Sequence, residues 1–262
     1  MRVKARKSLG QNFLINENIT QLISESTKIN TSDVLLEIGP GTGKLTDKLI
    51  NRNPKKIYVI EKDKNLSDLL IKKYGDKINV INKDILDYDE RLISSNNALI
   101  IFGNLPYNLS SQILIKQINN NFYFQNIKSM VLMFQKEVAD RILAKVGNKN
   151  YSRISVISQL FFKIDKIKEI GPENFNPKPK INSSILSFYP KQIYNQFKDI
   201  ENLQKITRIF FNERRKKIKK PLNLIFKDYK RKNLNFLDLN LRPQNLSPED
   251  YSKITSAYEE IN

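Results

Sequence analysis

The chain has 262 residues, 40% of them hydrophobic and 27% charged, which is ordinary for a folded protein with one large domain and a smaller appendage. It contains no cysteine and no histidine. These absences exclude disulfides, thiolate zinc sites, a cysteine nucleophile and a histidine base, and they disfavour triad hydrolysis and zinc deamination. A net charge of +18 favours a polyanionic partner, with nucleic acid ahead of an anionic membrane surface.

The sequence shows no sign of membrane insertion or export. No apolar run approaches the ~20 residues that a membrane-spanning helix needs. The basic N-terminus, residues 1–7, is not followed by the apolar segment of a secretory signal. We therefore expect a cytoplasmic protein that engages no membrane.

A short stretch, residues 11–14 (Gln-Asn-Phe-Leu), precedes the first predicted helix. Apolar Ile19, Leu22 and Ile23 recur at helical spacing, and Asn16 is a suitable N-cap for that helix. Taken alone, residues 11–14 are predicted to form an N-terminal arm folded onto the core.

A glycine-rich turn, Gly-Pro-Gly-Thr-Gly at residues 39–43, follows a predicted buried strand at 34–38 and opens a helix. Strand, glycine turn and helix in this order are typical of nucleotide-cofactor sites. The dinucleotide pattern G-x-G-x-x-G would need glycine at position 44, where this chain has Lys44. The turn therefore disfavours NAD and favours S-adenosylmethionine, which requires no pyrophosphate cradle.

Acidic residues follow the next two predicted strands. The strand 57–60 ends at Glu61, which is placed to accept hydrogen bonds from both ribose hydroxyls of a cofactor. The strand 78–81 leads to Asp84 and Ile85, which could accept the adenine amino group and cover the ring. The alternatives are a solvated acid at a strand end and an ordinary loop aspartate.

The apolar residues 99–102 predict a short buried strand that ends in the polar turn 103–108. Ligands bind beyond the carboxyl ends of strands in open α/β sheets, so Asn104, the carbonyls near Pro106 and the Tyr107 ring could hold an amino-substituted base. The alternative is a strand-to-helix turn in which the proline sets φ and the tyrosine covers the core.

A further strand at 129–133, a helix at 135–142 and a strand at 184–189 extend the pattern. The alternation of strands and helices predicts an α/β fold with a doubly wound, mostly parallel sheet. The region after residue 192 is predicted to be entirely helical.

The proline-rich segment 174–183 cannot form a regular helix. Phe175 could stack on a flipped base while Lys178 and Lys180 contact phosphates. Alternatively, the segment is a stiff connector whose phenylalanine fills the core.

Residues 205–232 carry twelve Lys and Arg against Glu213 and Asp228, a net charge of +10. Charge of a single sign, interleaved with three phenylalanines, is typical of an RNA-facing helix. The alternative is an ordinary solvated face.

Together these segments resemble one family, the ribosomal RNA small-subunit adenine N6,N6-dimethyltransferases (KsgA family). The matching motifs occur in one order over nearly the whole chain and are Gln11-Asn12-Phe13-Leu14, Glu37 to Gly43, Glu61, Asp84, Gly103 to Tyr107, Gln135-Lys136-Glu137 and Phe175-x-Pro-x-Pro-Lys180.

The resemblance implies a Rossmann-like class I methyltransferase domain at residues 1–191 and a smaller, basic, helical domain at 192–262 that docks on rRNA. It implies that S-adenosylmethionine donates methyl groups to the N6 atoms of two adjacent adenosines, in a hairpin loop near the 3′ end of 16S rRNA. The expected partner is small-subunit rRNA in an immature 30S particle during ribosome biogenesis, and the enzyme is expected to be a monomer without a metal.

The resemblance also implies roles for individual residues. The cofactor contacts would be Asn12, Leu14, Gly39, Gly41, Glu61, Lys62, Asp84, Ile85 and Asn104. The catalytic residues would be Asn104, Leu105, Pro106, Tyr107 and Phe175. RNA would be held by Lys178, Lys180, Arg214, Arg215, Lys216 and Lys217.

This chemistry needs no histidine. An adenine amino lone pair is delocalised into the ring, so it attacks poorly until its N–H groups are held by the Asn104 oxygen and by the carbonyl of Leu105 or Pro106. The sulfonium is already a good leaving group, so positioning and electrostatics suffice for an in-line methyl transfer.

Two residues depart from the family pattern. Ser152 stands where glycine is common, and Pro221 should start a new helix or kink the old one in a segment that is usually helical. Two other functions stay open: methylation of a large-subunit rRNA adenine, as in macrolide resistance, and a non-catalytic role in ribosome assembly or RNA binding.

Overall fold

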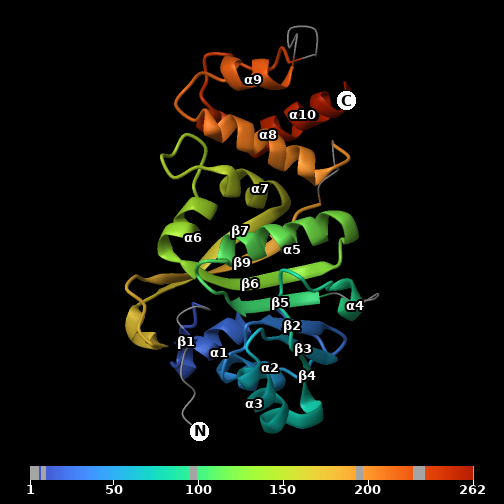
Figure 1. Cartoon of the computed structure of the whole chain (residues 1–262), viewed down its shortest axis with the longest axis vertical. Coiled ribbons are helices and arrows are strands. Elements are labelled where there is room, and N and C mark those ends of the chain that lie inside the picture. The colour runs from blue at the N-terminus through green and yellow to red at the C-terminus, as the bar shows by residue number, and fades with distance from the viewer. Residues whose placement is uncertain (1–5, 7–9, 95–98, 193–196, 227–233, 262) are drawn as a thin grey trace. The chain divides into compact units, whose positions relative to one another are not determined.

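The computed structural model describes residues 6, 10–94, 99–192, 197–226 and 234–261 (Figure 1). The chain forms two compact units. The first contains Met1–Ala139 and Ile164–Pro190, and the second contains Asp140–Lys163 and Lys191–Asn262. Residues 140–163 thus group with the C-terminal region, whereas the sequence predicted a single boundary after residue 191.

A seven-stranded sheet organises the first unit, with the order β4-β3-β2-β5-β6-β9-β7. Neighbouring strands from β4 to β6 are parallel, and β9 runs antiparallel to β6. The strands are β2 (Val34–Ile38), β3 (Lys56–Ile60), β4 (Asn79–Ile81), β5 (Leu99–Asn104), β6 (Ile127–Gln135), β7 (Phe162–Ile170) and β9 (Ser183–Pro190). The predicted doubly wound, mostly parallel α/β sheet is confirmed.

The register of the central strands aligns the ends that carry the predicted site. Ile38 of β2 lies opposite Ile60 of β3 on one side and Gly103 of β5 on the other. The residues that follow these positions, Gly39, Glu61 and Asn104, therefore leave the sheet at the same edge. This edge is where ligands bind in open parallel sheets.

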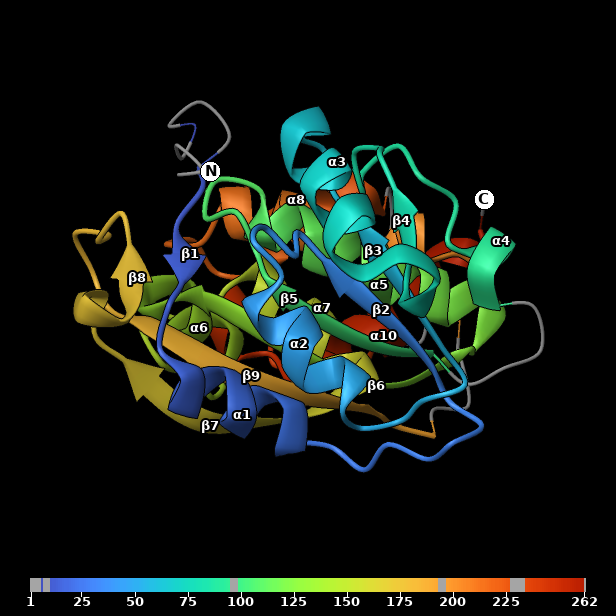
Figure 2. The same ribbon diagram turned by 90° about the horizontal axis from the view of Figure 1, so that it is seen from below.

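Among the described residues, six helices belong wholly or partly to the first unit: α1 (Glu17–Glu25), α2 (Lys44–Ile50), α3 (Lys64–Tyr74), α4 (Arg91–Ser94), α5 (Ser110–Phe124) and α6 (Lys136–Ile142), of which α6 continues into the second. The predicted N-cap of α1 is confirmed, since Asn16 Oδ1 accepts from the Asn18 N–H at 2.9 Å. Helix α1 packs against α2 (Figure 2).

The core of the first unit forms where strand side chains meet these helices. Leu35, Ile100 and Phe102 of the central strands are completely buried, because parallel strands covered on both faces consist of nearly continuous apolar residues. The sheet is thus a rigid platform for the loops at its edge.

Two strand features were not predicted from the sequence. β1 (Phe13–Leu14) pairs antiparallel with β8 (Phe175–Asn176), joining segments far apart in the chain. β7 contains many charged residues and therefore lacks the apolar run that predicts a strand, because it is the last strand in the sheet order and much of it is exposed.

The second unit is helical apart from the first residues of β7, over the part of it that the structure describes. Its helices α7 (Arg153–Phe161), α8 (Ile200–Asn212) and α10 (Pro248–Glu259) contact one another, and α9 (Lys219–Ile225) contacts α8. Tyr251 of α10 packs against Phe210 and Phe211 of α8, with ring centroids 5.4 and 6.0 Å apart.

Both departures from the family pattern are accommodated at helix starts. The Ser152 N–H donates to Ser155 Oγ at 2.9 Å, in a capping arrangement at the beginning of α7. Helix α8 ends at Asn212, and Pro221 lies in the first turn of α9. A proline is tolerated there because first-turn N–H groups have no partner within the helix. Of the two predicted outcomes, a new helix or a kink in the old one, the structure shows a new helix, which begins two residues before Pro221.

Candidate functional site

A cavity of about 290 Å³ lies at the carboxyl ends of the parallel strands in the first unit. All nine residues predicted to contact the cofactor line this cavity, as do Leu105, Pro106 and Tyr107 of the predicted catalytic set. They come from the N-terminal arm, the ends of β2, β3 and β5, and the loop after β4. The sheet register therefore gathers into one pocket the motifs that the sequence spreads over about a hundred residues.

The glycine turn after β2 closely approaches the N-terminal arm. Gly39, Gly41 and Gly43 have φ values of 67°, 59° and 81°, in the left-handed region that favours glycine. A Cβ on Gly41 would come within 2.8 Å of the Phe13 ring. The turn thus offers bare backbone to the cavity, and the arm fits against it without room for a side chain.

Glu61 is fixed at the end of β3 by backbone groups. Its two carboxylate oxygens accept from the N–H of Asp63 at 2.9 Å and the N–H of Gly41 at 3.2 Å. The residue is 6% exposed. Burial raises the pKa of Glu61, and the two backbone donors act against this rise. Each oxygen keeps a lone pair for a further donor, which suits a diol.

Asp84 is held in the loop after β4. One of its oxygens accepts from the Leu86 N–H at 2.9 Å, and the other lies 2.7 Å from Lys62 Nζ. Burial opposes ionisation of Asp84, but the hydrogen bonds from Lys62 and Leu86 prevail and lower its pKa. Ile85 beside it is buried and lines the cavity. A carboxylate acceptor next to an apolar side chain is the arrangement expected for an amino-substituted ring.

Glu37 also lines the cavity, although the sequence analysis gave it no role. Burial raises the pKa of Glu37 to about 8, against the Thr46 hydroxyl, which donates to Glu37 Oε2 at 2.6 Å. With this pKa, Glu37 is largely protonated at neutral pH. The feature of the sequence that could have pointed to Glu37 is an acidic residue inside an otherwise apolar strand.

The turn after β5 presents an oriented amide. Asn104 Nδ2 donates to the Asn12 carbonyl at 2.8 Å, so the amide oxygen is the group left to accept from a ligand. Tyr107 shares a hydrogen bond of 2.7 Å with Ser183, and burial raises the pKa of its hydroxyl despite this bond. The Asn104 amide and the Tyr107 ring are thus held in place by the arm and by β9.

Phe175 does not fit its predicted role as a stacking surface. Phe175 lies in β8, its side chain is 1% exposed and belongs to the hydrophobic core, and it does not line the cavity. The alternative interpretation, a phenylalanine that fills the core, describes this structure. The reason is the pairing of Leu14 with Phe175, which turns the proline-rich segment inward at this point.

The basic residues predicted to bind RNA differ in their surroundings. Lys178 and Lys180 of the first unit and Arg215 and Lys216 of the second have exposed side chains. In the second unit, Arg214 is partly buried and donates to Gln244 Oε1 at 3.2 Å and to the Lys149 carbonyl, while Lys217 donates to Asn240 Oδ1 at 2.9 Å. The basic residues at 227 and 230–232 lie outside the described residues.

Within the described ranges, no group of three or more acidic, histidine or cysteine side chains could hold a metal ion. In the same ranges, no helix is both long and apolar enough to cross a membrane.

Comparison with solved structures identifies the class of protein as a Rossmann-like methyltransferase. A dimethyladenosine transferase from Plasmodium falciparum matches with a TM-score of 0.77 and 29% identity, covering 92% of this chain and 95% of that one. The 23S rRNA methyltransferase ErmE shares the fold, with a TM-score of 0.69 at 19% identity over 95% of this chain and all of that one.

The chain belongs to the ribosomal RNA adenine dimethylase family, whose profile matches residues 2–260. The ribosomal RNA small subunit methyltransferase A of Pelagibacter ubique (strain HTCC1062) is 50% identical to it, over 100% of this chain and 99% of that protein. The family resemblance found from the motifs is confirmed.

Proposed function

We propose that this enzyme dimethylates N6 of two adjacent adenosines near the 3′ end of 16S rRNA, using S-adenosylmethionine, during assembly of the small ribosomal subunit. Its family is that of S-adenosylmethionine-dependent adenine dimethylases, and the relative with 50% identity carries a small-subunit name. The observation that carries the proposal is the oriented Asn104 amide at a cavity lined by Glu61 and Asp84.

The cavity suits S-adenosylmethionine by the chemistry of its groups. Glu61 would accept the ribose hydroxyls, and Asp84 would accept the adenine amino group with Ile85 against the ring. Gly39 and Gly41 line the cavity without a side chain, which allows close approach of the methionine portion. When bound, S-adenosylmethionine supplies an activated methyl group with a good leaving group.

The chain's own contribution is to hold the attacking amine. The Asn104 oxygen would accept one adenine N–H and so favour the pyramidal amine whose lone pair can attack. The Pro106 carbonyl already accepts from the Leu109 N–H at 3.0 Å, which favours the Leu105 carbonyl as the second acceptor. The Tyr107 ring would support the base. Restraint of this kind acts through orientation and needs no general base.

RNA would be held by the accessible basic residues. Lys178 and Lys180 would contact phosphates from the first unit, and Arg215 and Lys216 from the second. Arg214 and Lys217 hydrogen-bond to residues of their own unit. They would therefore both hold the conformation of the basic segment 214–217 and add positive charge. Contacts to phosphates give affinity that falls with salt.

The test is methyl transfer from radiolabelled S-adenosylmethionine to unmethylated small-subunit particles, followed by nucleoside analysis of both rRNAs. We expect dimethyladenosine in the small-subunit rRNA, with methyl incorporation approaching two dimethylated adenosines in each particle. Modification confined to the large-subunit rRNA would overturn the substrate. Cofactor binding without transfer to either RNA would favour a non-catalytic assembly factor.

A further inference from the structure

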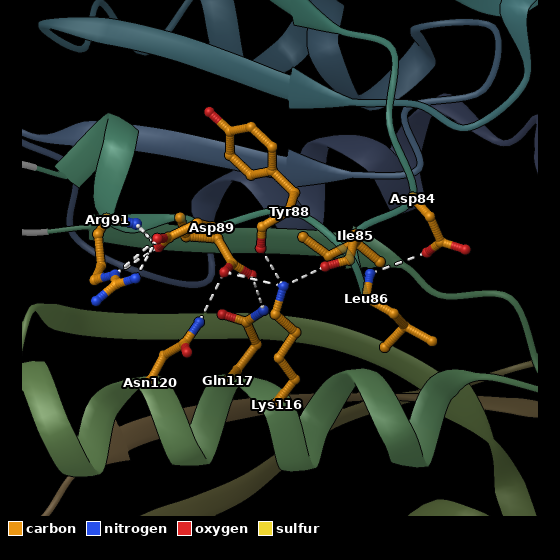
Figure 3. Close-up of polar contacts among 10 residues, drawn as sticks. Asp84, Ile85, Leu86, Tyr88, Asp89, Arg91, Lys116, Gln117 and Asn120 are labelled. Atoms are coloured by element: carbon orange, nitrogen blue, oxygen red, sulfur yellow. Dashed lines mark hydrogen bonds and ion pairs between the residues drawn. The ribbon is translucent and has the colours of Figure 1, made fainter.

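A buried polar network connects helix α5 to the loop that carries Asp84 (Figure 3). The Lys116 ammonium donates to the carbonyl oxygens of Ile85 and Tyr88 and lies 3.1 Å from the Glu90 carboxylate. The side chain of Lys116 is 19% exposed and that of Glu90 is 4% exposed. A lysine in such surroundings is committed to these partners and is poorly placed to meet a polyanion.

Two more side chains of α5 complete the network. Gln117 Nε2 and Asn120 Nδ2 each donate to the Glu90 carboxylate at 2.8 Å. In Figure 3, Lys116, Gln117 and Asn120 all project from the helix toward the loop. One helix face thus satisfies both a buried carboxylate and two backbone carbonyls, as buried polar groups require.

The loop itself has little regular structure to hold it. Residues 82–90 form turns between β4 and α4, yet Asp84 and Ile85 of this loop line the cavity. The hydrogen bond from Lys116 reaches the carbonyl of Ile85, immediately next to Asp84. Ile113 of the same helix lines the cavity as well, and α5 begins just after the turn that carries Asn104.

We propose that Lys116 is a positioning residue for the cofactor's adenine, because it fixes the Asp84–Ile85 backbone to the helix that follows the catalytic turn. This inference rests on the proposed function, in which Asp84 accepts the adenine amino group. Lys116 acts on the loop through its two bonds to backbone carbonyls, and Glu90 balances the charge of its ammonium.

The test compares two ligands by calorimetry in the absence of RNA: S-adenosylhomocysteine and S-inosylhomocysteine, whose 6-oxo group cannot donate to Asp84. The wild type is expected to bind the adenosyl ligand at least about 10-fold more tightly. Lys116→Met should reduce this preference to about 2-fold or less, since the Asp84–Ile85 backbone loses its hydrogen bond to α5. A purely structural role would weaken both ligands by the same factor and keep their ratio.

A double variant serves as a control, because Lys116→Met alone leaves the Glu90 carboxylate buried without its cation and could destabilise the fold. Lys116→Met with Glu90→Gln removes both charges and should lose the ligand preference in the same way. Glu90→Gln alone keeps the two bonds to carbonyls and should retain most of the preference. Thermal unfolding of each variant is measured alongside.

The outcomes separate the inference from the proposed function. An unchanged ligand ratio in both Lys116 variants would overturn the positioning role, as would a loss in Glu90→Gln equal to that in the double variant. Unfolding of both Lys116 variants would show that the network carries the fold instead and would also overturn it. A wild type that binds neither ligand, or both equally, would contradict the proposed cofactor site itself.

Discussion

The cavity at the strand ends and the basic segment 214–217 differ in how their charged residues are held. In the cavity, hydrogen bonds from backbone N–H groups and from a lysine hold the carboxylates of Glu61 and Asp84 in fixed orientations. In the basic segment, Arg215 and Lys216 are accessible to solvent. We therefore expect recognition of a small cofactor to depend on geometry, and recognition of a polyanion to need mainly a high density of positive charge.

The largest effect is expected at Asn104, where the geometric requirement is strictest. Asn104→Ala should lower methyl transfer by about 100-fold or more, because the adenine amine loses the acceptor that orients it. RNA affinity should be unchanged, since phosphate contacts are unaffected. Single-turnover methylation and filter binding to 16S rRNA measure the two effects. The matched control is Asn18→Ala, an exposed asparagine of α1 outside the cavity lining, and near-normal turnover in Asn104→Ala would contradict the proposal.

Gly41→Ala tests whether close packing in the cavity matters beyond backbone strain. The new Cβ would meet the Phe13 ring, so we expect S-adenosylmethionine affinity to fall by about 10-fold, together with a stability loss of ~1–2 kcal/mol from the left-handed φ. Gly75→Ala is the control, because Gly75 has φ 53° but a Cβ added to it would have no atom within 4 Å. Calorimetry measures S-adenosylmethionine affinity in both variants, and equal losses of affinity would refute the packing argument.

The basic segment should respond to charge and hardly at all to geometry. Arg215→Ala with Lys216→Ala is expected to weaken rRNA binding and to reduce the slope of log K against log salt by about 2, with unfolding unchanged. Arg214→Ala should instead destabilise the fold, because its bonds to Gln244 and Lys149 are lost. The control is the exposed pair Lys72→Ala with Lys77→Ala on the first unit. An unaltered salt slope would mark the segment as an ordinary solvated face.

Glu37 should make the free energy of unfolding depend on pH. Its pKa is raised from 4.5 to about 8 in the folded protein, so the stability contributed by the protonated form is lost as pH rises from about 4.5 to about 8. Glu37→Gln mimics the protonated form and lacks this loss. From pH 5 to pH 8, the free energy of unfolding of the wild type should therefore fall by about 1 kcal/mol or more relative to that of the variant. Chemical denaturation at several pH values tests this, and parallel profiles would contradict it.

Local patterns were enough to predict most of the first unit. The parallel strands, the N-cap at Asn16 and the helix start near Pro221 are confirmed, since hydrophobic period, side-chain caps and proline sterics act over a few residues. The nine predicted cofactor contacts also line the cavity, and all of them except Asn12 and Leu14 lie at the end of a strand of the seven-stranded sheet or in the turn that follows it. Their roles stay predictions until they are tested.

The amino-acid order alone was sufficient for the motifs, the α/β alternation and the family, which are all properties of neighbouring residues and their succession. Three features emerged only from the folded chain: the burial of Phe175 by its pairing with the N-terminal arm, the grouping of residues 140–163 with the C-terminal unit, and the reach of Lys116 to the loop of Asp84. These are contacts between segments distant in the chain, and no local pattern of apolar and polar residues specifies them.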